Sequence, residues 1–384
     1  MNTPRFPTAP AWQPPGGQYT AEEIAQQPAL WQELADLLEG AQARLDGFLG
    51  DWLHDPRKRV IFTGAGSSGF IAEMVADTIH AQWPADVRAL HTTSLLTHPS
   101  SYLKRDRPTL LVSFGRSGSS PESVAAVDLL RGAVDATRFL DITCNADGEL
   151  ARRGRDRVDT CTLLMPAASC DRAFAMTSSL TCMVLAALAT FDSAPWPQRL
   201  AQLRSLAALQ VNAVRAWQSA IADLAATPFT RVIYLGSGVL EAWAREAALK
   251  LQELTAGRVA TFANTPLGFR HGPKSLLDGN TLVVMVRSTQ AVSRRYEQDL
   301  LDELRRDRVA GRVLSVGPAI AGEADDFSLE VPDMADAWLA PVWLAFPQLL
   351  ALHRSAALGL GPDNPFPDGT VNRVVKGVTI HSHD

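Results

Sequence analysis

Residues 59–69 read RVIFTGAGSSG, an apolar stretch that runs directly into glycines and serines. The apolar residues predict a buried strand over 59–63, and the glycines predict its turn into a helix that ends near His80. The same pattern returns at 231–238, where RVIYLGSG precedes residues of helical spacing through Leu254. A strand, a glycine turn and a helix form the building unit of a parallel sheet.

This pattern belongs to an internal repeat. Gly64 and Gly236 are separated by the same offset as the apolar strands that begin at Thr109 and Thr281, since 236 − 64 and 281 − 109 both give 172. A repeat of alternating strands and helices predicts two tandem α/β domains. We expect both to be doubly wound and flavodoxin-like, each with a parallel sheet flanked by helices.

Breaks along the chain predict four segments. They are an N-terminal arm with helices over 1–50, a first domain over 51–205, a second domain over 206–360 and a C-terminal tail over 361–384. The spacing of apolar residues after Thr20 predicts two helices in the first segment, with Pro28 in the first turn of the second helix. The prolines of 361–369 exclude regular structure there, because proline lacks a backbone donor and restricts the residue before it.

Composition and charge narrow the classes of partner. The 384 residues are 46% hydrophobic and carry a net charge of −5, so no basic field attracts nucleic acid or an anionic membrane. The longest apolar run, 183–191, is far shorter than the roughly 20 residues of a membrane span. Proline and glycine interrupt residues 1–20, where a secretion signal needs an apolar stretch. We expect a cytoplasmic protein with reduced cysteines at Cys144, Cys161, Cys170 and Cys182.

A candidate anion site follows the strand that begins at Thr109. Residues 115–120 read GRSGSS, in which glycines let backbone amides approach an anion and serine hydroxyls add donors. Pro121 then begins a helix whose N-terminus favours negative charge, and the turn after the neighbouring strand supplies the opposite wall. The alternative is a flexible connection without a ligand. The predicted phosphate ligands are Gly66, Ser67, Ser68, Arg116, Ser117, Gly118, Ser119 and Ser120.

Neither glycine turn has the features of a nucleotide site, so we expect no cofactor. The turn at 64–66 lacks the third glycine of the dinucleotide fingerprint, and neither loop is followed by Lys-Ser or Lys-Thr. The second copy of the loop, 287–292, contains no glycine, so one half is expected to bind phosphate while the other supplies chemistry. His381 and His383 offer two ligands on a chain end, which is a poor metal site, and we expect no metal.

These motifs resemble a known family. GAGSS at 64–68 and SGSS at 117–120, in a chain with a degenerate second copy, resemble the double sugar isomerase (SIS) domain arrangement. Residues 248–254, 271–273 and 374–379, which read ALKLQEL, HGP and VVKGVT, are similar to the isomerase half of glucosamine-6-phosphate synthase. The resemblance extends over most of the chain and implies two tandem SIS domains.

The resemblance also implies catalytic roles. In that family the position of Glu253 holds the acid and base of the reaction, and those of His271 and Lys376 hold a ring-opening histidine and a lysine that contacts the sugar carbonyl. The chemistry asks for such a set, because proton transfer between C1 and C2 of an aldose needs one carboxylate that alternates between base and acid. A histidine titrates near neutrality, and a buried lysine polarises a carbonyl or forms a Schiff base. Lys250, three residues before Glu253, is expected to support that carboxylate.

Each of these residues also has a plain structural interpretation. Glu253 is otherwise an exposed helix charge, and Lys250 its ordinary ion-pair partner. His271 is otherwise a surface residue in a loop, and Lys376 a solvated lysine. The proline-rich segment before Lys376 favours the functional interpretation of that residue.

A closer resemblance lies in three other segments. Residues 24–31, 113–118 and 372–375, which read IAQQPALW, SFGRSG and NRVV, resemble bacterial galactosamine-6-phosphate deaminase/isomerases, often labelled tagatose-6-phosphate ketose/aldose isomerases. Synthases have serine and glutamine where this chain has Gly115 and Arg116, so side-chain ligation of phosphate is expected to differ. The resemblance implies conversion of galactosamine 6-phosphate to tagatose 6-phosphate and ammonia. It also implies at least a homodimer, because in relatives the histidine reaches the site from the neighbouring subunit.

The direction of the reaction follows from what a synthase needs. Its ammonia usually comes from a glutamine-hydrolysing domain with an N-terminal cysteine, whereas this chain has no cysteine before Cys144 and only residues 1–50 before its first domain. We therefore expect deamination. The alternatives are a ketose/aldose 6-phosphate isomerase, a glucosamine-6-phosphate deaminase and a non-catalytic sugar-phosphate-binding regulator. The joint presence of Glu253, His271 and Lys376 argues against the regulator.

Overall fold

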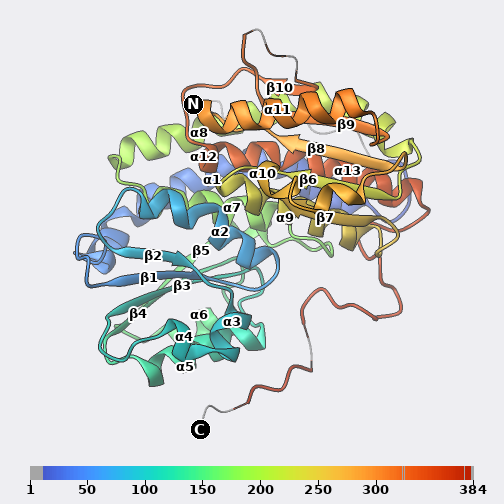
Figure 1. Ribbon diagram of the computed structural model, residues 1–384. Coiled ribbons are helices and arrows are strands. Elements are labelled where there is room, and N and C mark those ends of the chain that lie inside the picture. The colour runs from blue at the N-terminus through green and yellow to red at the C-terminus, as the bar shows by residue number, and fades with distance from the viewer. Residues whose placement is uncertain (1–11, 322, 324, 376, 382–384) are drawn as a thin grey trace, which may run out of the picture. The chain divides into compact units, whose positions relative to one another are not determined.

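The computed structural model describes residues 12–321, 323, 325–375 and 377–381, and its chain divides into two compact units. The first-sheet unit comprises 30–171, 178–204 and the described residues after 367. The second-sheet unit comprises the described residues up to 29, 172–177 and 205–367. Each unit is built around one five-stranded parallel sheet, and Figure 1 shows their strands in blue to green and in yellow to orange.

The first sheet has the strand order β2-β1-β3-β4-β5. Its strands are β1 (Arg59–Thr63), β2 (Asp86–Ala89), β3 (Thr109–Gly115), β4 (Thr137–Thr143) and β5 (Thr160–Leu164). One face packs against α2 (Ser67–His80) and α7 (Ser178–Phe191), and the other against α5 (Pro121–Ala133) and α6 (Glu149–Gly154), as Figure 1 shows. The short helices α3 (Thr92–Thr97) and α4 (Pro99–Tyr102) lie beside α5. Ile61, Leu111 and Phe139 contribute one residue from each of the central strands to the core under α5.

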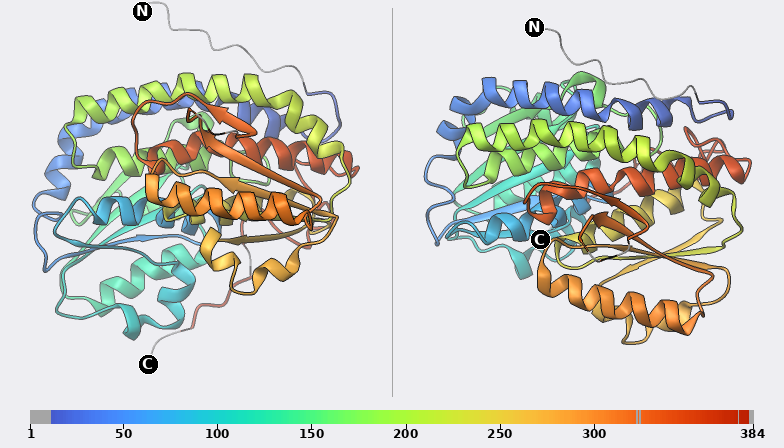
Figure 2. Two further views of the ribbon diagram at one scale, coloured as in Figure 1. Left: turned by 45° about the horizontal axis from the view of Figure 1, so that its top comes forward. Right: turned by 90° about the horizontal axis from the view of Figure 1, so that it is seen from above.

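The second sheet has the order β10-β9-β8-β6-β7. Its strands are β6 (Arg231–Leu235), β7 (Ala260–Asn264), β8 (Thr281–Val286), β9 (Arg312–Pro318) and β10 (Phe327–Leu329). Its helices are α9 (Val239–Leu254), α10 (Pro266–Phe269), α11 (Ala291–Asp307), α12 (Asp336–Trp343) and α13 (Ala345–Ala357). Figure 2 shows α11, in orange, along one face of this sheet, and Leu300, Leu301 and Leu304 bury that helix against the strands. These two parallel sheets flanked by helices confirm the predicted fold class.

Both sheets reverse their strand order at the same place. Arg59 of β1 pairs with Thr109 of β3, and Arg231 of β6 pairs with Thr281 of β8, so the two pairs share one register. The order reverses between β1 and β3 in the first sheet and between β6 and β8 in the second. Open parallel sheets bind ligands beyond the carboxyl ends of the strands at such a reversal.

The N-terminal segment forms one helix, α1 (Gln18–Leu49), so the prediction of two helices was wrong. Pro28 lies inside it and has no N–H to donate to the carbonyl of Ile24, one turn earlier. The side-chain amide of Gln27 donates to that carbonyl instead, at 3.1 Å, and also to Gln348 at 2.8 Å. The helix therefore continues through the proline, because a neighbouring side chain satisfies the group that proline leaves unpaired.

A second long helix, α8 (Trp196–Ala226), begins in the first-sheet unit, which contains its residues up to Arg204, and there it lies beside the part of α1 that follows residue 29 (Figure 2). Arg204 of α8 contacts Asp36 at 2.9 Å and Glu39 at 2.7 Å.

The four cysteines carry free thiols, all but Cys170 buried. Within the described ranges, no helix combines the length and the apolar character of a membrane span. A short 3-10 helix over Ala167–Ser169 precedes α7, and another over Pro273–Leu276 follows α10.

Candidate active site

The loop after β3 is held in place by the connection between β4 and α6. Thr143 Oγ1 donates to the carbonyl of Gly115 at 2.6 Å, and the amide of Leu150 donates to the carbonyl of Gly118 at 2.8 Å. Gly118 has a φ of 61°, and a Cβ there would lie 2.9 Å from Thr143 Oγ1. Only glycine suits this position, because a side chain would be strained and crowded at once. The loop ends at Ser120, the N-cap of α5.

Two of the predicted serine ligands also stabilise the loop itself. The amide of Ser119 donates to Ser117 Oγ at 3.2 Å, and the side-chain amide of Asn145 donates to the carbonyl of Ser117 at 3.3 Å. Ser119 Oγ accepts a hydrogen bond from the amide of Glu149 at 3.0 Å. The loop is thus ordered by bonds within the first-sheet unit, as a preformed binding loop requires.

The other predicted wall lies at the end of β1. Gly66, with a φ of 55°, precedes α2, whose first two residues, Ser67 and Ser68, are both buried. β1 pairs with β3 as far as Thr63 and Ser113, so the two turns follow neighbouring strand ends. A helix N-terminus carries unbonded amides and the positive end of the helix dipole. The structure therefore brings the predicted phosphate ligands to one edge of the first sheet, at its reversal of strand order.

Arg116 reaches a partner that sequence reasoning missed. Its side chain is 6% exposed, and Nη2 donates to the carbonyl of Arg373 at 3.1 Å. Arg373 lies in the C-terminal tail, three residues before Lys376. Farther along, Ile380 and His381 line a cavity together with residues of α5. The loop and the tail are thus connected within the first-sheet unit, while Lys376 itself lies outside the described residues.

The catalytic candidate of α9 belongs to a group of three charges. Lys250 is 1% exposed, and its Nζ lies 3.0 Å from Glu253 Oε2 and 3.2 Å from Glu246 Oε1. Burial acts to lower the pKa of Lys250, but the charges of Glu246 and Glu253 outweigh it and raise that pKa above its usual value. Glu253 is the more accessible carboxylate, with 26% of its side chain exposed against 2% for Glu246. A buried, charged lysine thus fixes a carboxylate that solvent or a substrate reaches.

Sequence reasoning missed Glu246, although a signal was present. Glu246 and Lys250 are four residues apart in a helix, the spacing at which two side chains meet on one face. Glu246 matters because it holds the lysine from the buried side of α9.

His271 lies in the turn between α10 and the 3-10 helix of Pro273–Leu276. Its backbone amide donates to the carbonyl of Gly268 at 3.0 Å, while its side chain is exposed in the single chain. Thr265 is the N-cap of α10, and its Oγ1 accepts a hydrogen bond from the Gly268 amide at 3.0 Å, which holds the turn. Glu253 and His271 therefore both come from the second-sheet unit, whereas the predicted phosphate ligands come from the first.

The proline-rich start of the tail is anchored to the N-terminus of α1. Asp363 Oδ1 accepts hydrogen bonds from the backbone amide of Thr20 at 2.8 Å and from its hydroxyl at 2.7 Å, and Oδ2 accepts from the amide of Tyr19 at 3.1 Å. Its own amide donates to the carbonyl of Gly16 at 2.7 Å. A residue far away in the sequence thus caps the first turn of α1, where an unpaired amide favours a carboxylate.

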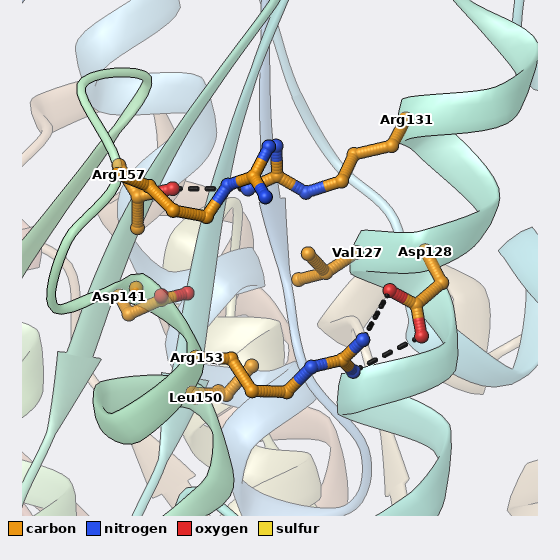
Figure 3. A pocket seen from close by; sticks show the side chains of 9 residues that line it. Val127, Asp128, Arg131, Asp141, Leu150, Arg153 and Arg157 are labelled. Carbon is orange, nitrogen blue, oxygen red and sulfur yellow. Dashed lines mark hydrogen bonds and ion pairs between the residues drawn. The ribbon is translucent and has the colours of Figure 1, made fainter.

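A separate cavity of about 110 Å³ lies on a face of the first sheet, between α5, α6 and β5 (Figure 3). Its guanidinium groups already have carboxylate partners: Arg153 contacts both oxygens of Asp128 at 2.8 and 3.0 Å, and Arg157 contacts Asp159 at 3.1 Å. Asp141 lines the cavity, and burial raises the pKa of its carboxyl to about 7. Because these arginines are paired and the cavity lies off the strand ends, we do not assign it to the phosphate.

The chain is similar to known proteins over nearly its whole length. A model of the SIS domain matches residues 53–191. The chain is 42% identical over 378 residues to D-galactosamine-6-phosphate deaminase AgaS of Escherichia coli, covering 95% of this chain and 96% of that protein. It is 40% identical to the protein of the same name from Shewanella sp. (strain ANA-3), covering 95% and 92%. The crystal structure of tagatose-6-phosphate ketose/aldose isomerase from Escherichia coli superposes with a TM-score of 0.87 at 38% identity, covering 98% and 99%.

Proposed function

The chain belongs to the family of D-galactosamine-6-phosphate deaminases called AgaS, and on this premise we propose that it converts galactosamine 6-phosphate and water to tagatose 6-phosphate and ammonia. The observation that carries the catalytic part is the group of three charges on α9. Lys250 lies 3.0 Å from Glu253 and holds that carboxylate in one position. A fixed carboxylate suits proton transfer between adjacent carbons.

The reaction is divided among the predicted residues as follows. The loop at 115–120 and the serines that begin α2 hold the phosphate, and His271 moves the proton that opens the ring. Glu253 removes the proton from C2 of the open-chain amino aldose and returns it to C1, while the C1 oxygen gains a proton and the C2 amine loses one. The resulting imine at C2 takes up water, and ammonia leaves to give the ketose. Lys376 polarises the C1 carbonyl, whose oxygen stays on C1 and becomes the hydroxyl of the ketose.

The exposure of His271 supports a shared site. A catalytic side chain that is exposed in the single chain is available to the site of a neighbouring copy, so we propose a homodimer or a larger homo-oligomer. A cytoplasmic location belongs to the same proposal. The test of the shared site mixes inactive His271→Ala and Glu253→Gln chains, which regain activity only if one site draws on two copies.

A panel of substrates separates this function from its alternatives. The purified chain is incubated with galactosamine 6-phosphate, glucosamine 6-phosphate and tagatose 6-phosphate, and ammonia and ketose are measured. Release of ammonia mainly from the galacto compound supports the proposal. Interconversion of tagatose 6-phosphate with an aldose, without release of ammonia, would instead support a ketose/aldose 6-phosphate isomerase. Binding without turnover on any substrate would support the regulator.

A further inference from the structure

The second sheet has its own strand-order reversal, between the carboxyl ends of β6 and β8. The equivalent place in the first sheet lies between β1 and β3, where the predicted phosphate loop begins. The turns at the two places differ, since 287–292 contains no glycine. What occupies the second reversal is therefore a separate question from what the first one binds.

A carboxylate of the chain itself occupies it. Glu297, from the second turn of α11, is 0% exposed. Its Oε1 accepts a hydrogen bond from Ser237 Oγ at 2.7 Å, two residues after β6, and its Oε2 accepts one from the backbone amide of Ser288 at 3.0 Å, two residues after β8. Arg287 Nε lies 3.4 Å from Oε2. One carboxylate thus joins the two strand ends at which an open parallel sheet binds its ligand.

The donors around Glu297 are those that commonly bind a phosphate. They are a hydroxyl, a backbone amide that follows a strand, and a guanidinium group. Asp336 of α12 completes the turn, with Oδ2 accepting from Ser288 Oγ at 2.5 Å and Oδ1 from the amide of Thr289 at 2.7 Å. The turn therefore directs its donors at internal carboxylates, as the first loop is predicted to direct its donors at a sugar phosphate.

The charge of Arg287 is balanced by carboxylates that hold the side chain beside Glu297. Its Nη1 lies 2.9 Å from Asp325 and its Nη2 lies 2.8 Å from Glu323, and its side chain is 1% exposed. Burial raises the pKa of Glu297, and the hydrogen bonds from Ser288 and Ser237 and the charge of Arg287 act against this rise. The guanidinium is thus rigidly held beside Glu297 by carboxylates on its other side.

We propose that the second-sheet unit retains an anion-binding site at its strand-order reversal and that the carboxylate of Glu297 fills it as an internal ligand. Glu297 already satisfies the hydroxyl, the amide and the guanidinium that would bind a phosphate, so external phosphate has no access to these donors. It follows that each chain takes up one sugar phosphate, through the first-sheet unit, and this consequence rests on the proposed function. The inference that Glu297 fills the site of the second-sheet unit does not depend on the proposed function.

The test opens the site by Glu297→Ala and supplies small anions to the full chain. Formate and inorganic phosphate are expected to raise the Tm of the variant by several degrees more than that of the wild type, whereas neutral formamide is not. Calorimetry is expected to show one additional phosphate per chain. Adding Ser237→Ala to the variant is expected to weaken this added binding several-fold. Glu297→Gln, which keeps the volume, is expected to gain no anion binding.

An alanine variant whose response to formate and phosphate equals that of the wild type would overturn the proposal. If that variant unfolds in buffer alone, recovery of the fold with formate but not with formamide supports the proposal, and recovery with neither overturns it. Neither readout uses turnover, so a failure of the proposed deaminase activity leaves this test intact.

Discussion

Lys250 is the residue that positions the carboxylate of Glu253, the proposed catalytic group. It is buried between Glu246 and Glu253, and two carboxylates keep its charge in an environment that otherwise disfavours it. The pair of Lys250 and Glu253 is predictable from helical spacing, and the structure shows that contact. The role of Glu253 in proton transfer stays a prediction, because spacing reveals that two charges meet but not what they act upon.

Replacement of Lys250 by methionine is expected to lower stability by about 3 kcal/mol, because it removes the cation from a buried ion pair. It is also expected to lower kcat, since Glu253 loses the group that positions it. The matched control is Arg245→Met on the same helix, whose contact with Glu241 is exposed and contributes at most about 1 kcal/mol. Denaturant unfolding and steady-state kinetics check both variants. Equal losses in the two variants would contradict the assigned role.

The buried carboxyl of Asp141 is expected to make the free energy of unfolding depend on pH, and Asp141→Asn is expected to lack this dependence. Its folded pKa of about 7 lies above the usual value of 3.8, so between these pH values the folded chain holds a proton that the unfolded chain has released. The contribution of Asp141 to the free energy of unfolding is therefore fully present below pH 3.8. It is lost as the pH rises toward 7, by roughly 1.4 kcal/mol per pH unit. Asp141→Asn is expected to be more stable than the wild type at pH 8, and the advantage is expected to shrink toward pH 4. A constant difference across this range, measured by thermal unfolding, would show that Asp141 does not titrate in this way.

At the scale of elements, the loop after β3 and the start of α1 show which structural features a local sequence pattern can predict and which it cannot. The glycine and serine pattern predicted the loop because its backbone demands are local, as Gly118 illustrates. The continuous α1 was not predictable, because Pro28 is tolerated through Gln27 and Gln348, and Gln348 is distant in the sequence. The capping by Asp363 was missed for the same reason.

Substitution of Gly118 by alanine is expected to raise the KM for the sugar phosphate at least tenfold. A Cβ at this positive φ costs about 1–2 kcal/mol and also meets Thr143, so the loop must shift. Gly132→Ala, in α5, meets nothing within 4 Å and serves as the control, with unchanged KM and equal or higher stability. An unchanged KM for Gly118→Ala would separate this loop from phosphate binding.

Removal of the carboxylate of Asp363 is expected to destabilise the second-sheet unit by about 1–2 kcal/mol, because the first turn of α1 loses its cap. Asp368→Ala is the control, since Asp368 contacts only Thr370 within an exposed turn of the tail in the described structure. Hydrogen exchange of the Tyr19 and Thr20 amides checks the assignment directly. Both amides are expected to exchange faster in the Asp363 variant and at the wild-type rate in the control.

At the scale of the whole molecule, the sequence predicted the fold class and the family, and both are confirmed. Strands with apolar patterns and a constant repeat offset are visible along the chain, so two parallel sheets follow from it. The sequence does not reveal in this way how the site is assembled, since the predicted phosphate ligands belong to one unit and Glu253 and His271 to the other. Their roles, that of Lys376 and the oligomeric state therefore stay predictions that catalysis must test.

The most direct test of the central claim compares the wild type with Glu253→Gln on galactosamine 6-phosphate, following ammonia, tagatose 6-phosphate and substrate binding together. The wild type is expected to form ammonia and tagatose 6-phosphate in equal amounts. The variant is expected to bind the substrate with affinity within a few-fold of the wild type and to lose at least a thousandfold in kcat, because the amide cannot take the proton from C2. Undiminished ammonia release by Glu253→Gln, or none by the wild type, would contradict the account.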